Sequence, residues 1–274
     1  MPLKISLHTE SSIPLEVDSI QLETIRTQSA EEIAKIKIFR GNEELPCGDF
    51  FNVTGCASDD NTVVWEGNLH KVKLIGDHLS EGTIRVEGNV GMHLGAEMTG
   101  GEIILNGNAS DWVGAQMSGG RIRVHGNVGH LCGAVYRGGR KGMTGGEILI
   151  DGNAGNELGH TMRRGLIAVG GNSGDAAGVG MIAGSILIFG EPGIRNGAGM
   201  KRGTIALCNP ELTPEILPTF KRASNYEPLF LNLYFKHLKQ CGFAVPDECL
   251  TTSYQRYCGD LLELGKGEIF ANAG

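Results

Sequence analysis

The chain has 274 residues, of which 41% are hydrophobic, with seven cysteines and a formal net charge of −7. The acidic balance argues against nucleic acid as a partner, and no apolar run is long enough to predict a membrane segment, so we expect a cytoplasmic protein. Because the cysteine count is odd and no CxxC pair occurs, we expect reduced thiols and no metal or iron–sulfur site.

Residues 1–61 are predicted to form a small β-rich N-terminal cap. Alternating apolar residues at Ile5 and Leu7, and again at Leu15 and Val17, indicate short strands. Ser29 followed by Glu32 is typical of a capping box at the start of a brief helix. Such a cap would cover the unpaired strand edge at the open end of a repeat structure.

Residues 62–208 repeat with a nearly fixed period and predict a parallel β-helix of about seven coils. Residues 62–68 match residues 83–89 and indicate an imperfect first coil. The regular units then begin every 19 residues, with one step of 26, at Gly82, Gly101, Gly120, Gly146, Gly165, Gly184 and Gly203. The third and fifth positions of every unit are aliphatic, which is the spacing of a strand with one buried face. Helical repeats need a different spacing and longer units, so the fold class is all-β.

Two further columns support stacked coils. One corner position is occupied in successive units by Asn89, Asn108, Asn127, Asn153 and Asn172, whose amides could hydrogen-bond along the axis. Another column holds methionines, with Met143 just after the insertion. A methionine row could hold copper or haem, but we interpret it as flexible core filling.

Residues 209–274 are predicted to form a C-terminal extended and helical tail. Three prolines at 210, 214 and 218 indicate a stiff passage that does not continue the coil, and Pro228 and Gly242 bracket a helix at about 228–241. This helix is apolar on nearly every side, and the outward strand positions become apolar in the later units. The sequence therefore predicts either a helix packed on the flank of the β-helix or a face that meets another protein chain.

The long step of 26 residues contains an inserted loop, residues 136–142, that is rich in basic residues. With cations near the same corner of later units it forms a candidate anion-binding patch, composed of Arg137, Arg140, Lys141, Arg163, Arg164, Lys201 and Arg202. Three interpretations are open. The cations could be solvated and paired with acidic neighbours, they could bind an anionic chain, or they could contact the acidic surface of another protein.

Residues with catalytic potential show no catalytic arrangement. The eight histidines share no repeat column, and no catalytic Ser-His-Asp order, phosphate-binding loop or nucleophile elbow is present. We therefore predict no catalytic residue, no metal ligand and no cofactor bound by this chain alone.

The repeated blocks Gly-x-x-Met-x-x-Gly-x-Ile-x-aliphatic-x-Gly, such as residues 95–107 and 159–171, resemble the C subunit of formylmethanofuran dehydrogenase. That family includes the C subunit of the bacterial formyltransferase/hydrolase complex. The resemblance extends to GDFFNVTG before the repeats and RYCGDLLELGKGEIF after them, while Arg140 departs from the glycine of the motif. More distantly, the repeats are similar to the C-terminal β-helical domain of the glutamate synthase large subunit.

This resemblance implies a right-handed β-helix that serves as a non-catalytic scaffold. The implied partners are an amidohydrolase-like hydrolase, a formate-dehydrogenase-like protein and a formyltransferase, which are the A, B and D subunits of the complex. The implied reaction is conversion of formylmethanofuran to formate, with polyglutamylated methanofuran and tetrahydromethanopterin as coenzymes of the complex. Alternatives are the archaeal, CO2-reducing dehydrogenase, a binding module for the polyglutamate arm of methanofuran, and a free-standing acyltransferase β-helix, which the period of 19 disfavours.

Overall fold

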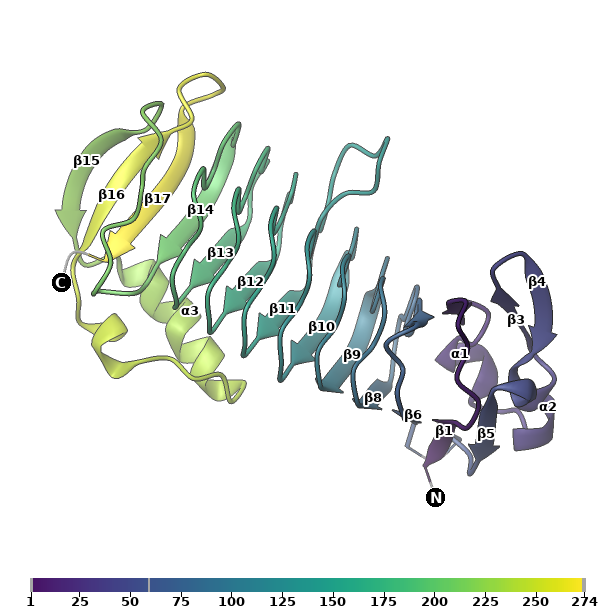
Figure 1. The fold of residues 1–274 in the computed structure, drawn as a ribbon. Coiled ribbons are helices and arrows are strands. Elements are labelled where there is room, and N and C mark those ends of the chain that lie inside the picture. Colours follow the sequence, from purple (N-terminus) through teal and green to yellow (C-terminus); the bar gives the residue numbers. More distant parts are fainter. Residues whose placement is uncertain (1, 59, 273–274) are drawn as a thin grey trace.

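The computed structural model describes residues 2–58 and 60–272 and is dominated by one large sheet. This sheet has 13 strands in the order β15-β16-β17-β14-β13-β12-β11-β10-β9-β8-β6-β1-β5, and a second sheet has the order β4-β3-β2-β7. Most neighbours in the large sheet are parallel, as in a β-helix (Figure 1). The prediction of a mostly β structure with a long parallel sheet is confirmed.

The strands and helices follow one another along the chain with few long connections. The strands are β1 (Leu3–Leu7), β2 (Leu15–Glu16), β3 (Lys37–Arg40), β4 (Glu43–Pro46), β5 (Phe51–Thr54), β6 (Thr62–Glu66), β7 (Val72–Lys73), β8 (Thr83–Glu87), β9 (Thr99–Asn106), β10 (Gly119–Val124), β11 (Glu147–Ile150), β12 (Leu166–Val169), β13 (Ser185–Ile188), β14 (Arg202–Leu207), β15 (Lys221–Tyr226), β16 (Tyr254–Gly259) and β17 (Lys266–Asn272). The α-helices are α1 (Leu22–Ile25), α2 (Ala30–Ala34) and α3 (Leu229–Gln240), and short 3-10 helices cover Cys47–Asp49 and Asp247–Leu250.

The strand register aligns the aliphatic columns expected from the repeats. Ile84 pairs with Ile103, and the same row continues through Ile122 and Ile148 to Ile205. All of these side chains are buried in one continuous core. The methionines at 98, 117, 143, 162, 181 and 200 are fully buried in the same core, so they fill space between stacked units.

Asparagine side chains join neighbouring units at one corner. The Asn127 carbonyl oxygen, Oδ1, accepts the Asn153 backbone N–H at 2.8 Å, and the same bond recurs from Asn89 to Asn172. A second row at another corner was not predicted, although its members share the period of the repeats. It consists of side-chain acceptors at Asp111, His130, Asn156 and Asp175, each bonded to a backbone N–H of the next unit.

Glycine is required where adjacent units approach most closely. Gly120 has φ of +81°, and a Cβ atom there would lie 2.4 Å from the Gly100 carbonyl oxygen. Since that neighbour is backbone, the contact could not be relieved by a side-chain rotation.

The N-terminal segment extends the sheet and adds the second one. β6 pairs in parallel with β8 at the predicted offset, and β1 pairs with β6. Ser29 and Glu32 form the predicted capping box of α2. β5 follows the 3-10 turn at Cys47–Asp49 and pairs antiparallel with β1.

The C-terminal segment is more strand-rich than predicted. After α3, the chain returns to the sheet, where β17 pairs in parallel with β14 and places Ile269 beside Ile205. β16 and β15 then add antiparallel to that edge. The predicted extended and helical tail did not include these strands at residues 221–226, 254–259 and 266–272.

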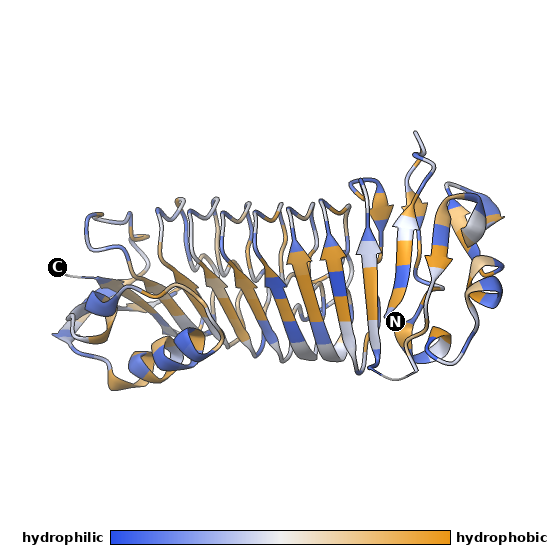
Figure 2. Cartoon of the chain, turned by 90° about the horizontal axis from the view of Figure 1, so that it is seen from below, coloured by the Kyte–Doolittle hydropathy of each residue, from blue (hydrophilic) through white to orange (hydrophobic). Residues whose placement is uncertain are grey.

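Helix α3 covers the outer face of the sheet toward its C-terminal end (Figure 1). Leu231, Phe235 and Leu238 are buried against Leu166 and Leu187, which point outward from the strands. Figure 2 shows the corresponding change, since strands near this end are apolar along their length while the middle strands alternate. The apolar outward positions are thus explained by the chain's own helix.

Candidate functional site

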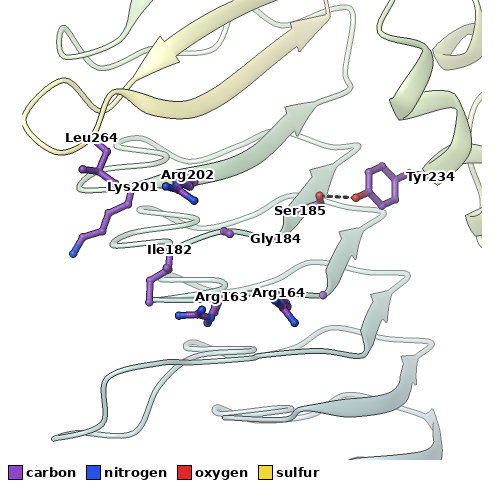
Figure 3. Close-up of a pocket in the computed structure, with 11 residues that line it drawn as sticks. Arg163, Arg164, Ile182, Gly184, Ser185, Lys201, Arg202, Tyr234 and Leu264 are labelled. Atoms are coloured by element: carbon purple, nitrogen blue, oxygen red, sulfur yellow. Dashed lines mark hydrogen bonds between the residues drawn. The ribbon is translucent and has the colours of Figure 1, made fainter.

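The predicted basic patch divides into two parts in the structure. Arg163, Arg164, Lys201 and Arg202 line one cavity of about 570 Å³, together with Tyr234 of α3 and Leu264 (Figure 3). Arg137, Arg140 and Lys141 are exposed on the inserted loop, which projects from the edge of the sheet between β10 and β11, and are not among the lining residues (Figure 1). Of the seven cations that the sequence grouped together, four therefore line one cavity and three lie outside it.

The repeat explains why the cavity lies where it does. Arg163 and Arg164 precede the unit start Gly165, whereas Lys201 and Arg202 precede Gly203. The unit between them has Ile182 and Ala183 at the same two positions, followed by Gly184 and Ser185. Two pairs of long cationic side chains thus stand on either side of a unit with shorter side chains, which leaves a hollow with a basic rim (Figure 3).

The charges of this rim are largely uncompensated by the side chains that the structure describes. Lys201 Nζ lies 4.0 Å from the Glu263 carboxylate. In residues 2–58 and 60–272, no acidic side chain forms an ion pair with Arg163, Arg164 or Arg202. Since exposed guanidinium groups offer several donors in a planar fork, the cavity suits carboxylate or phosphate groups.

Ser185 and Tyr234 form the inner wall of the cavity, and neither was predicted as a site residue. The Ser185 hydroxyl donates to the Tyr234 hydroxyl oxygen at 3.0 Å (Figure 3). Tyr234 also borders a second, more apolar cavity of about 450 Å³ lined by Leu166, Leu233 and His237. No repeat column could have identified Tyr234, because its position depends on how α3 docks.

One side of α3 presents apolar side chains to solvent. Leu229 is 76% exposed and Leu233 is 71% exposed, and Phe230 between them is partly exposed. Leu262 and Leu264, in the connection before β17, are also exposed. We call Leu229, Phe230 and Leu233 of α3 the leucine-rich face. Exposed apolar side chains in such numbers are typical of a protein contact surface.

The basic cavity offers groups that can bind anions. Its eleven lining residues include four cations and the Ser185 and Tyr234 hydroxyls, and none of the eleven is a carboxylate, imidazole or thiol. Burial raises the pKa of Cys47 to about 12, so this thiol is unsuited to nucleophilic attack. None of the helices in the described residues is long and apolar enough to cross a membrane.

A group of three side chains that can bind metals lies next to the more apolar cavity. Glu147, His237 and Cys241 place a carboxylate oxygen, an imidazole nitrogen and a sulfur within 4.8 Å of one another. This group was not predicted, because some ninety positions separate Glu147 from the other two residues and no metal-binding spacing connects them.

Comparisons with known proteins identify the family to which this chain is similar. A family model described as "GXGXG motif" matches residues 67–216. The C subunit of tungsten-containing formylmethanofuran dehydrogenase 2 from Methanothermobacter thermautotrophicus is 37% identical over 90 residues, which are 32% of this chain and 33% of that protein. The C subunit of molybdenum-containing formylmethanofuran dehydrogenase 1 from Methanosarcina barkeri is 37% identical over 85 residues, which are 30% of this chain and 28% of that protein. The matched segments thus span about a third of these curated relatives or less.

A solved structure matches over nearly the whole chain. It is the crystal structure of the formyltransferase/hydrolase complex (FhcABCD) from Methylorubrum extorquens with methylofuran. One of its chains is 32% identical to the present chain with a TM-score of 0.89, and the match covers 99% of the present chain and 100% of that chain. The chain described here therefore belongs to the GXGXG-motif family that includes the C subunit of formylmethanofuran dehydrogenase and this chain of the formyltransferase/hydrolase complex.

Proposed function

We propose that this chain is a non-catalytic scaffold within a formyltransferase/hydrolase complex. Its partners would be an amidohydrolase-like hydrolase, a formate-dehydrogenase-like protein and a formyltransferase. The complex would convert formylmethanofuran to formate with polyglutamylated methanofuran and tetrahydromethanopterin as coenzymes. The observation that carries the proposal is the end-to-end match to one chain of the complex from Methylorubrum extorquens.

The proposed architecture is a right-handed β-helix of about seven coils spanning residues 62–208, with end pieces at 1–61 and 209–274. A rigid body of this kind suits a scaffold, because every unit is fixed to its neighbours by strand pairing and by side-chain rows. The leucine-rich face on α3 offers a surface that a partner protein would cover.

Purification of the tagged full chain from its own organism tests this role. Mass spectrometry should identify a hydrolase, a formate-dehydrogenase-like protein and a formyltransferase in constant proportion to the chain. The isolated chain should not hydrolyse a formylated coenzyme, whereas the purified complex should do so. Recovery of the chain as an active, partner-free oligomer would instead favour an independent enzyme such as an acyltransferase.

The archaeal dehydrogenase is the first alternative, since the curated relatives are formylmethanofuran dehydrogenase subunits. The two assignments differ in the redox centre of the formate-dehydrogenase-like partner. Tungsten or molybdenum in the purified complex, with formation of formylmethanofuran from CO2, would favour the dehydrogenase. A metal analysis without either element, together with formate release, would favour the hydrolase complex.

A second candidate function is binding of the polyglutamate arm of methanofuran in the basic cavity. The observation that favours it is the rim of Arg163, Arg164 and Arg202, which form no ion pair in the described part of the chain, around a hollow that can accept carboxylates. The triple change of these arginines to glutamate should weaken retention of the coenzyme in the complex and leave the set of assembled partners unchanged. The change of Arg137, Arg140 and Lys141 to glutamate is the matched control, because these three side chains lie on the inserted loop outside the cavity. Equal retention by both variants would exclude this function.

A further inference from the structure

The geometry points to a zinc site formed by Glu147, His237 and Cys241, and we propose that these three side chains bind one Zn²⁺ ion. His237 Nε2 lies 2.6 Å from Glu147 Oε1 and 3.7 Å from the Cys241 sulfur. All three donor atoms lie within 4.8 Å of one another. This spacing brings all three atoms near a common centre.

The backbone holds the three donors in place from two separate elements. Glu147 begins β11 and is paired on one side with Arg121 and on the other with Leu166. His237 and Cys241 are four residues apart at the C-terminal end of α3, so they project from the same face of the helix. The buried Phe235 and Leu238 fix this end of α3 against the sheet. The convergence is thus a product of the packed fold.

The surroundings of Glu147 favour binding through one carboxylate oxygen. Arg121 Nε donates to Glu147 Oε2 at 3.1 Å, which leaves Oε1 facing His237. Arg121 also lies 3.7 Å from the Glu102 carboxylate, so its positive charge is shared between two acids. An arginine that orients a ligating carboxylate is a typical outer partner of a metal site.

The donor set selects the class of metal. One oxygen, one imidazole nitrogen and one thiolate sulfur match the ligands that Zn²⁺ prefers, whereas Mg²⁺ and Ca²⁺ require oxygen ligands. Zinc is normally tetrahedral, so one position would remain for water or for a donor from another molecule. Hollows on both sides give access to it, one lined by Glu147 and His237 and the other by Arg121 and Cys241.

Metal binding would replace the hydrogen bond between His237 and Glu147. Zinc bonds to nitrogen and oxygen of about 2.0–2.2 Å in tetrahedral geometry place the two ligand atoms roughly 3.4 Å apart. The present separation is 2.6 Å, so the two side chains would have to part by less than about 1 Å. Rotation of the partly exposed His237 side chain can supply this movement.

Titration of the purified full chain with Zn²⁺ and with Co²⁺ tests the proposal. Competition with a chromophoric chelator should show one tight Zn²⁺ ion per chain, and Co²⁺ should produce a sulfur-to-cobalt charge-transfer band. Cys241→Ser should abolish the band and weaken Zn²⁺ binding at least about tenfold, and Glu147→Gln should weaken binding while the band remains in saturating Co²⁺. Cys258→Ser is the matched control, because Cys258 is also partly buried but lies in β16 away from the cluster.

Two further measurements distinguish loss of the zinc site from misfolding of the variants. Circular dichroism should show the same β signal for all variants, and Zn²⁺ should raise the melting temperature of the unchanged chain and of Cys258→Ser but not of Cys241→Ser. A chain that binds no Zn²⁺, a cobalt spectrum without a sulfur band, or a band that persists in Cys241→Ser would overturn the proposal.

Discussion

Ser185 Oγ lies 3.0 Å from the Tyr234 hydroxyl oxygen and joins strand β13 to helix α3 at the boundary of two cavities. On one side of this bond is the basic cavity, and on the other is the apolar cavity beneath Leu233. Helix α3 therefore has two different sides: its buried side closes the outer face of the sheet, and its other side leaves Leu229 and Leu233 exposed. The two sides can be tested separately by substitutions on each of them.

The buried side of α3 should contribute strongly to stability. Phe235 is fully buried and its ring centroid lies 6.0 Å from that of Phe189 in an edge-to-face arrangement. Phe235→Ala should lower the free energy of unfolding by about 3–5 kcal/mol, because it removes a large core side chain and leaves a cavity. Leu233→Ala on the exposed side should change it by less than about 0.5 kcal/mol. Denaturant unfolding of the two variants measures the difference, and equal effects would contradict this docking of α3.

The exposed side of α3 should matter for assembly instead. Leu229 and Leu233 are exposed, so replacing both with serine should leave the melting temperature nearly unchanged. The same double variant should recover fewer partner proteins after affinity purification, because the partner would lose apolar contact area. Ile194→Ser is the control, since Ile194 is 43% exposed at a different part of the surface. Normal recovery with the double variant would place the partner contact elsewhere.

Each asparagine of the corner row should add a similar, small amount to the free energy of unfolding. Asn127 accepts the Asn153 backbone N–H and donates to Asn108 Oδ1 at 3.0 Å. Asn127→Ala should therefore cost about 1–2 kcal/mol in the free energy of unfolding, as two hydrogen bonds between units are lost. Asn106→Ala provides a comparison in a neighbouring repeat unit. The Asn106 side chain donates to the exposed Glu87 side chain, so this change should cost about 0.5 kcal/mol or less. An equal loss of unfolding free energy in Asn127→Ala and Asn106→Ala would show that the asparagine row stabilises the stack no more than an exposed side-chain hydrogen bond does.

The chain should become less stable in mild acid through His93. Burial lowers the pKa of His93 below its ordinary value, and Lys73 adds to this effect against smaller opposing contributions from Glu16 and Asp111. The unfolded chain then binds a proton at His93 at a higher pH than the folded chain does. This contribution to stability is intact above about pH 6.5 and is lost progressively as the pH falls toward the lowered folded pKa.

His93→Asn should reduce that acid sensitivity. Asparagine tolerates the left-handed backbone of this position, where φ is +66°, and cannot take up a proton. The difference in unfolding free energy between pH 7.0 and pH 5.5 should therefore be smaller in His93→Asn than in the unchanged chain. His70→Asn is the control, because His70 is an exposed histidine. An identical acid dependence in the unchanged chain and in His93→Asn would show that other groups control it.

The central sheet could be predicted from the repeats, because every unit starts with glycine and has aliphatic residues at its third and fifth positions. The sequence also carries a signal for β17, because GEIF at residues 267–270 is close to GEII at residues 101–104. This signal was missed because about sixty residues without the repeat precede it. Tyr234, Glu147 and Cys241 could not be placed in this way. Their positions depend on how an irregular segment docks on a regular surface, and a sequence period carries no information on that docking. The same applies to the inserted loop, whose cations resemble those of the cavity in composition but not in location.

Affinity purification of the tagged chain from its own organism, followed by mass spectrometry and an assay of formylated-coenzyme hydrolysis, is the most direct measurement of the scaffold role. The account predicts hydrolase, formate-dehydrogenase-like and formyltransferase partners in fixed proportion, with activity in the assembled complex and none in the separated chain. Elution of the chain without these companions, or turnover by the chain in isolation, would contradict it.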